Sequence, residues 1–164
     1  AFVPEVVLEH PEVVSQLHRE FIRAGSDIVQ AFTYYGHREK LRIIGKEHLL
    51  EPLQKNALKI ANDSKKEFKD LDLLVCGDIA NTNVYDPNDK KSNIECQKMF
   101  EEQVSWAKEA GVDFIVAETI TWAEEMKIAL KAIKDAGLIA VCNYAFRRDG
   151  KTTKSYGRIQ NKFF

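Results

Sequence analysis

The sequence predicts an α/β protein with about four parallel strands that alternate with helices. Segments with helical periodicity alternate with near-continuous apolar runs, as expected of parallel strands covered on both faces. One helix-to-strand junction also recurs, as AGSDIV at 24–29, AGVDFIV at 110–116 and AGLIAV at 136–141. Such a repeat is typical of a stacked architecture, either a doubly wound sheet or a (β/α) barrel. No G-x-G-x-x-G or P-loop motif is present, which argues against nucleotide-binding doubly wound folds.

Two helices are expected in the first half of the chain. The segment 10–25, HPEVVSQLHREFIRAG, has Pro11 in its first turn and Gly25 at the position that follows a helix. A second helix is expected from about 46 to 68, with a late start or a kink at Pro52.

Two further helices are expected in the second half, each opened by a capping box. The first box is SNIE at 92–95, and Gly111 ends that helix. The second is TWAE at 121–124, and that helix ends at 136–137.

Four apolar runs between these helices are the predicted strands, and the chain after them is polar and irregular. The segment 78–91 reads as a long polar loop. The residues from 146 to 164 are expected to be an irregular basic tail. The predicted strands are 27–32, 72–77, 113–118 and 138–144.

Composition excludes several classes of protein. The chain has 164 residues and a net charge of −1, which gives no electrostatic footprint for nucleic acid or an anionic membrane. The apolar runs are far shorter than the ~20 residues of a transmembrane helix. The three cysteines, without C-x-x-C spacing, predict no disulfide framework and favour a reducing, cytoplasmic location. A zinc site built from these three alone is the less favoured interpretation.

Candidate site residues follow the predicted strands, because ligands bind at the carboxyl ends of parallel strands. Glu118 is the most informative, since a carboxylate at the end of a buried strand is costly unless it is paired or bound to a ligand. It could hold a substrate ammonium, or it could cap the next helix or pair with a nearby cation. The other residues at these ends are Thr33, Tyr34, Tyr35, Gly77, Asp78, Asn81, Thr119, Asn143 and Tyr144.

Aromatic, histidine and cysteine residues near these strand ends each have a structural interpretation, and some also have a functional one. Tyr34 and Tyr35 could wall a small-molecule pocket or pack as ordinary aromatics. His37 could serve as an acid or base, although a lone loop histidine is usually solvated. Cys76 and Cys142 lie in apolar runs, where cysteine behaves as a small hydrophobe.

Two stretches carry a resemblance to a known family. EHPEVVSQLHREFIRAGSDIVQAFTYY and GVDFIVAETITWAEE resemble segments of the homocysteine-binding S-methyltransferases, which include betaine–homocysteine S-methyltransferase. The resemblance covers roughly residues 2–145. It implies that residues 1–145 form part of a homocysteine-binding (β/α)8 TIM barrel.

The resemblance also implies roles for particular residues. Glu118 would bind the amino group of homocysteine, and Tyr35 would be the pocket tyrosine that closes a T-F-T-F-Y-like motif. Phe2 falls where betaine-using members have a tryptophan, and it offers a weaker cation–π face. Asp78 stands where a second glycine is expected. The substrate-binding set implied in this way is Glu118, Tyr35, Thr33, Phe2, Thr119 and Gly77.

Other motifs of the family are absent from the chain. The G-D-G motif of the first strand does not occur, nor do the N-C and G-G-C-C motifs whose three cysteines hold zinc. The resemblance therefore implies zinc as the cofactor of a complete family member. It identifies no metal ligand and no catalytic residue among the 164 residues of this chain. We expect an incomplete chain, inactive by itself.

Three functions remain open at this point. The first is a homocysteine S-methyltransferase that passes a methyl group from a cationic donor, such as betaine or S-methylmethionine, to homocysteine. The second is a non-catalytic half-barrel or pseudoenzyme that binds a small amino acid or a protein partner. The third is another barrel enzyme acting on a small amino acid or carboxylate. The expected partners are small molecules, with homo-oligomerisation as an option.

Overall fold

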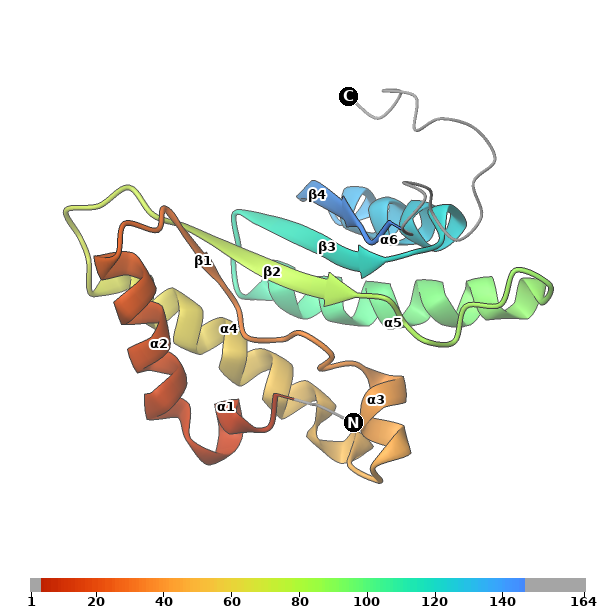
Figure 1. Cartoon of the computed structure of the whole chain (residues 1–164), viewed down its shortest axis with the longest axis horizontal. Helices are drawn as coiled ribbons and strands as arrows, with labels where there is room; N and C mark the ends of the chain where they lie inside the picture. Colours follow the sequence, from red (N-terminus) through yellow and green to blue (C-terminus); the bar gives the residue numbers. More distant parts are fainter. Residues whose placement is uncertain (1–3, 147–164) are drawn as a thin grey trace.

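Four parallel strands form one sheet in the consecutive order β1-β2-β3-β4 (Figure 1). The structure, a computed structural model, describes residues 4–146. The four predicted strands and their parallel direction are thus confirmed. Their bounds are Ile28–Gln30 for β1, Leu74–Ala80 for β2, Phe114–Ile120 for β3 and Ile139–Tyr144 for β4.

The consecutive strand order decides between the two architectures that the sequence left open. A doubly wound sheet reverses its strand order at a switch point, whereas each strand of a barrel lies beside the previous one. The helices that follow β1, β2 and β3 also contribute to one continuous core. The described residues are therefore part of a (β/α) barrel, as the resemblance implied.

All four predicted helices are present, and three short elements were not predicted. The predicted ones are α2 Pro11–Arg23, α4 Leu50–Lys66, α5 Lys90–Glu109 and α6 Ala123–Asp135. The short ones are α1 Val6–Glu9, α3 Arg38–Ile43 and the 3₁₀ turn η1 Glu47–Leu49. Six residues or fewer are too short to give a hydrophobic periodicity. The late-start option at Pro52 is the correct one, because α4 begins only two residues before it.

The recurring junction has a simple backbone cause. Gly25, Gly111 and Gly137 follow α2, α5 and α6 with φ of 98°, 72° and 78°. This left-handed conformation reverses the chain out of the helix, and glycine adopts it without steric cost.

Both predicted capping boxes are wrong. The N-cap of α5 is Asp89, whose carboxylate accepts a hydrogen bond from the Lys91 amide at 2.9 Å. Ser92 lies inside the helix, and its hydroxyl donates to the backbone carbonyls of Asp86 and Asp89. At α6 the N-cap residue is Trp122, so Thr121 lies one position too early to cap.

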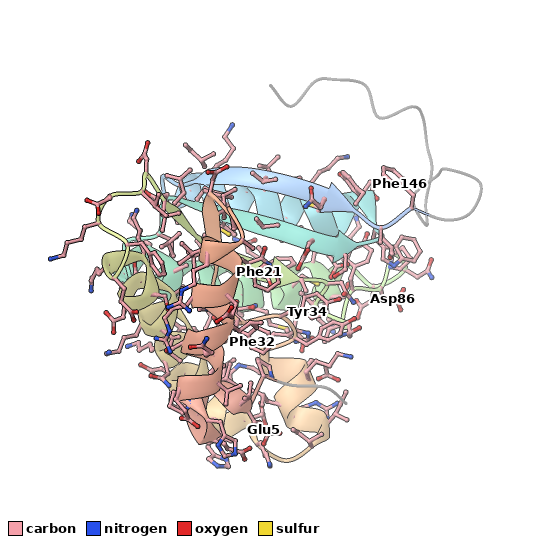
Figure 2. The ribbon with its side chains drawn as sticks, turned by 60° about the vertical axis from the view of Figure 1, so that its left-hand side comes forward. Glu5, Phe21, Phe32, Tyr34, Asp86 and Phe146 are labelled. Carbon is pink, nitrogen blue, oxygen red and sulfur yellow. The ribbon has the colours of Figure 1, made fainter. Side chains whose placement is uncertain are left out.

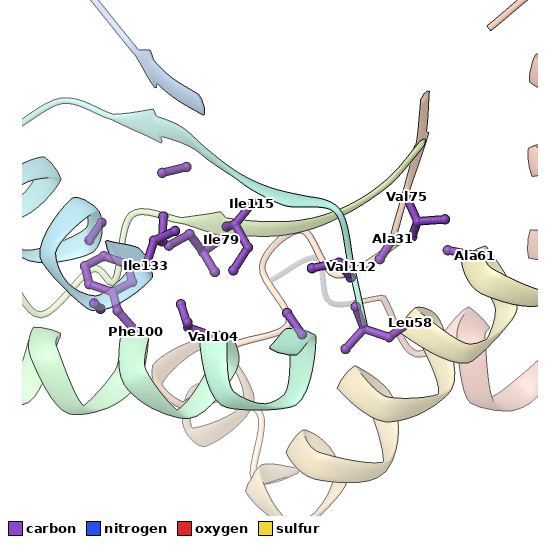
Figure 3. Packing of buried hydrophobic residues seen from close by; sticks show 14 of the residues in the cluster. Ala31, Leu58, Ala61, Val75, Ile79, Phe100, Val104, Val112, Ile115 and Ile133 are labelled. Atoms are coloured by element: carbon purple, nitrogen blue, oxygen red, sulfur yellow. The ribbon is translucent and has the colours of Figure 1, made fainter. Parts of the chain in front are cut away.

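The core lies between the sheet and its helices (Figure 3). Phe100 and Val104 of α5 point toward Ile79 and Ile115 on the sheet. A cavity between these layers would be costly, because the loss of one large buried side chain destabilises a protein by about 2–5 kcal/mol. This face of the sheet is thus fixed by packing.

Within residues 4–146, helices do not cover the opposite face of the sheet, called the open face here. Cys76, Phe114 and Val116 form a separate small cluster there. Large apolar side chains at its margins are exposed: Ile28 by 44%, Leu74 by 41%, Ile139 by 70% and Val141 by 40%. Within residues 4–146, no helix is both long and apolar enough to cross a membrane.

Two strands extend beyond their predicted ends. β2 continues to Ala80, so Gly77 and Asp78 lie within the strand. β3 continues to Ile120, so Glu118 does not end it. The prediction failed because both strands carry polar residues where the sequence pattern reads as a loop.

Candidate functional site

Glu118 lies on the open face, near the carboxyl end of β3. Its side chain is half-buried, and Oε1 accepts a hydrogen bond from Nε2 of Gln30 at 3.3 Å. Among residues 4–146 it forms no ion pair. The alternative that Glu118 pairs with a nearby lysine or arginine therefore finds no support in this part of the chain, and its charge is held by a neutral amide.

The residue after Glu118 breaks the regular strand. Pairing between β3 and β4 shifts register between Ala117 and Ile120, and Thr119 has φ 57°. The Thr119 hydroxyl donates to the Glu118 carbonyl at 2.7 Å. Tyr34 also donates to this hydroxyl, at 3.2 Å. The irregularity re-aims the strand at the candidate site, as bulges near active sites do.

Backbone strain is concentrated at the same edge of the sheet. The described chain has three non-glycine residues with positive φ: Tyr35 at 58°, Asn83 at 63° and Thr119 at 57°. They follow β1, follow β2 and lie near the end of β3, respectively. Such conformations cost of order 1–3 kcal/mol each and cluster at functional sites. This edge is therefore the best candidate for a binding site.

Tyr35 lies among aromatic and cationic neighbours. Its ring centroid is 4.2 Å from that of Tyr34, and Nζ of Lys40 lies 4.2 Å from its ring centroid. The neighbouring Tyr34 side chain raises the pKa of Tyr35, and partial burial raises it further. Lys40 thus occupies one face of the predicted pocket tyrosine.

Thr33 and Gly77 are placed differently from the other predicted residues. Thr33 is buried, and its hydroxyl donates to the Asp78 carbonyl at 2.9 Å, which ties the loop after β1 to β2. A Cβ at Gly77 would point to the helix side, 3.1 Å from Cβ of Ala107. The structure therefore does not bring Gly77 together with Glu118. Phe2 lies outside the described residues.

Asp78 is a buried carboxyl that the implied substrate-binding set did not include. It is 3% exposed, and neither oxygen has a hydrogen-bond partner within residues 4–146. Burial raises the pKa of Asp78 well above its ordinary value, and the charge of Glu118 raises it further, while the Gln30 amide lowers it. The sequence signal was an aspartate within an apolar run.

A cleft of about 350 Å³ runs beside β1. Leu17 and Phe21 of α2 line one side of it, and Gln30, Tyr34 and Asp78 are also among its lining residues. Figure 2 labels Phe21, Phe32 and Tyr34, the aromatic side chains of this region. Asp78 and Gln30, the hydrogen-bond partner of Glu118, thus line the same cleft.

His37 is buried, so the expectation of a solvated loop histidine is wrong. It is 1% exposed, and Nε2 lies 3.4 Å from Nδ2 of Asn83. Burial lowers the pKa of His37 to about 4, with a further decrease from the charge of Lys40 and an opposing effect of Glu39. Its neutral ring joins the segments that follow β1 and β2.

The described residues do not fit a metal centre. Between positions 4 and 146, no group of three or more histidine, cysteine, aspartate or glutamate side chains could hold an ion. Cys76, Cys96 and Cys142 are all free thiols. Burial raises the pKa of Cys76 to about 12, which disfavours the thiolate that binds metals.

Comparison with known families gives one extensive match. The family described as Homocysteine S-methyltransferase matches residues 3–161. Betaine–homocysteine S-methyltransferase 1 of mouse (Mus musculus) is 37% identical over 138 residues, which cover 83% of this chain and 33% of the mouse protein. The zebrafish (Danio rerio) protein of the same name is 34% identical over 151 residues, covering 91% and 36%. The chain thus spans about a third of the length of these curated relatives.

Solved structures with a similar fold come from the Escherichia coli homocysteine methyltransferase MmuM. The oxidized form matches with a TM-score of 0.75 and 18% identity, covering 90% of this chain and 57% of that one. The metallated form matches with a TM-score of 0.73 and 19% identity, covering 90% and 58%. At this identity the likeness concerns the fold, and it agrees with the partial barrel described above.

Proposed function

Since the chain belongs to the homocysteine S-methyltransferase family, we propose that the protein to which it belongs transfers a methyl group from a cationic donor to the sulfur of homocysteine. Methionine is the product, so the protein serves methionine biosynthesis. Betaine and S-methylmethionine are the proposed donor types. The free state of the three cysteines supports a cytoplasmic location.

The observation that carries this proposal is the state of Glu118. Its half-buried carboxylate accepts a hydrogen bond from the neutral Gln30 amide, and the described residues supply no cation for it. A substrate ammonium would provide the missing positive charge together with hydrogen-bond donors. Charge-assisted bonds of this kind are roughly twice as strong as neutral ones. Tyr34 and Thr119 fix the backbone from which this carboxylate projects.

Zinc is the cofactor that the family resemblance implies. Its chemistry would be to hold the homocysteine sulfur as a nucleophilic thiolate at neutral pH. The three cysteines do not fit this role, because they lie apart from any cluster of potential ligands in the described residues. The role proposed for the described residues is therefore recognition of the amino acid.

The proposal is tested by substituting Glu118→Gln and measuring homocysteine binding by calorimetry. We expect the dissociation constant to rise about 10- to 100-fold, since a hydrogen bond to a charged group contributes about 1.5–3 kcal/mol. Glu124→Gln is the matched control, because Glu124 is an exposed carboxylate on α6. Equal affinity in wild type and Glu118→Gln would remove the basis of the proposal.

The second candidate, a half-barrel that binds without catalysis, is favoured by one observation. The described residues hold no cluster of potential metal ligands. The two candidates are separated by incubating the protein with zinc, homocysteine and either betaine or S-methylmethionine. Methionine formation supports the transferase. Homocysteine binding without methionine formation supports the binding module, and zinc-independent turnover without homocysteine supports another barrel enzyme.

A further inference from the structure

The side chain of Asp78 has no role in the hydrogen bonds described so far, although its buried position is costly. A buried carboxylate without hydrogen bonds is strongly disfavoured, and proteins rarely keep one that is unpaired. Asp78 is 3% exposed, lines the cleft beside β1, and has no partner for either oxygen among residues 4–146. A ligand is therefore the missing partner to consider.

The strand register places Asp78 and Glu118 on the same face. Asp78 pairs with Val116, and Ala80 pairs with Glu118, so the two carboxyls are diagonal neighbours on adjacent strands. Gln30, from β1, donates a hydrogen bond to Glu118, and its amide also lowers the pKa of Asp78. Three polar side chains from β1, β2 and β3 thus lie together on an otherwise apolar face.

The groups that face Asp78 provide no positive charge at neutral pH. β1 contributes the Gln30 amide, β2 contributes the Cys76 thiol and β3 contributes Glu118. His18 and Tyr34 line the same cleft, whose described lining residues include neither lysine nor arginine. Burial lowers the pKa of His18, so this imidazole is neutral as well. The site therefore has an excess of acidic groups.

We propose that Asp78 is a second carboxyl of the substrate pocket, which selects a ligand carrying a primary ammonium group and releases its own proton when that group binds. This inference rests on the proposed role of Glu118. In the free protein Asp78 is a neutral carboxylic acid. The bound ammonium keeps its own charge, the O–H bond of Asp78 breaks, and the proton passes to solvent.

The number of donors on the ligand explains why an ammonium is selected. A primary ammonium has three N–H donors, enough for both Glu118 and Asp78. A trimethylammonium group has none and would leave the oxygens of Asp78 without partners. Asp78 thus favours the amino acid substrate over a quaternary ammonium donor at this position.

The test uses ligands without a thiol, so that sulfur cannot be the source of a released proton. L-Methionine carries the ammonium, and 4-(methylsulfanyl)butanoate is the same chain without it. Titration calorimetry of the full chain, in two buffers with different ionisation enthalpies, counts the protons released. We expect wild type to release about one proton with methionine and none with the butanoate. Over the pH range below the pKa of Asp78, its affinity for methionine should increase by up to about tenfold for each unit that the pH is raised.

Variants separate this inference from the function on which it rests. Asp78→Asn should abolish proton release and flatten the pH dependence. Asp78→Glu keeps the ionisable group and should retain proton release. This variant provides the test if Asp78→Asn does not fold. Asp70→Asn, at an exposed aspartate, is the control.

The possible failures are distinguishable. If Glu118→Gln weakens methionine binding but wild type releases no proton, the role of Asp78 is wrong and the proposed function survives. If Glu118→Gln has no effect, the proposed function fails first. Equal binding of methionine and the butanoate would overturn selection of the ammonium.

Discussion

Glu118 and His37 at the candidate site each have a neutral amide as a polar neighbour. His37 is the most buried example. It precedes α3, its ring lies 6.1 Å from Tyr35 in an edge-to-face arrangement, and Asn83 is its polar neighbour. Because burial lowers the pKa of His37 to about 4, the folded protein keeps this ring neutral where the unfolded chain protonates it.

The buried His37 makes stability dependent on pH. The contribution is complete above pH 6.5 and is lost as the pH falls toward 4, because over that range the unfolded state binds a proton that the folded state does not. We expect a loss of up to ~3 kcal/mol from this residue. Urea unfolding at several pH values should give a flatter profile for His37→Asn than for wild type.

The control for this prediction is His48→Asn, since His48 is exposed. Its profile should match that of wild type. Part of the slope will remain in His37→Asn, because burial also lowers the pKa of His18. An unchanged slope in His37→Asn would show that His37 is not buried as a neutral ring.

For single residues, the sequence could predict which side chains follow the strands, because that depends on position along the chain. It could not predict which of them are buried, because that depends on packing. Glu118 could be identified because it ends an apolar run and matches a family motif. Burial of Asp78 and His37 could not be identified, because it arises when the segment after β1 folds against β2 and its loop. Such contacts join residues about 45 positions apart and leave no local pattern.

At the scale of elements, β2 and α5 approach each other closely at Gly77. Gly77 lets the helix approach the sheet, since a Cβ there would lie 3.1 Å from Cβ of Ala107 and 3.4 Å from Cγ1 of Ile115. Gly77 was predicted to bind substrate, and a Cβ built at this position would point toward the helix. Packing of α5 gives a second reason for glycine at this position.

Gly77→Ala should therefore destabilise the protein by about 1–3 kcal/mol, the usual cost of overpacking. Ala107→Gly alone should cost about 1 kcal/mol through helix propensity. If the two Cβ atoms clash, the double variant loses less than the sum of the single variants in urea unfolding. Homocysteine affinity should stay unchanged in folded Gly77→Ala. A substrate role for Gly77 would instead weaken binding without a loss of stability.

The elements that could be predicted were the long ones. α2, α4, α5 and α6 each have at least 13 residues and a clear apolar stripe. The caps of α5 and α6 were misassigned because several residues near each start could cap, and at α5 only the folded loop selects Asp89. The end of β3 was missed because a register shift lets the strand continue past a carboxylate.

At the scale of the whole molecule, the open face and two strand edges are the main liability. Within residues 4–146, β1 pairs only with β2 and β4 only with β3. Ile139 and Val141 are exposed beside the β4 edge. Unprotected edges and apolar faces promote association between copies.

We therefore expect the isolated chain to self-associate or to be marginally stable. Sedimentation velocity over a range of concentrations should show oligomers, and the melting temperature should rise with concentration. Ile139→Lys combined with Val141→Lys should reduce association. Leu71→Lys is the control, because Leu71 is exposed and lies outside the four strands. A wild-type monomer with a sharp, concentration-independent melt would contradict this prediction.

The consecutive strand order has a kinetic consequence. Each strand pairs with the strand made just before it, so every new helix–strand unit finds its docking surface already synthesised. Contacts between neighbouring units close short loops, which favours rapid folding. A ribosome releases roughly 5–20 residues per second, slowly enough for one unit to dock before the next emerges. This order therefore suits folding during synthesis, with β1 as the template on which the sheet is extended.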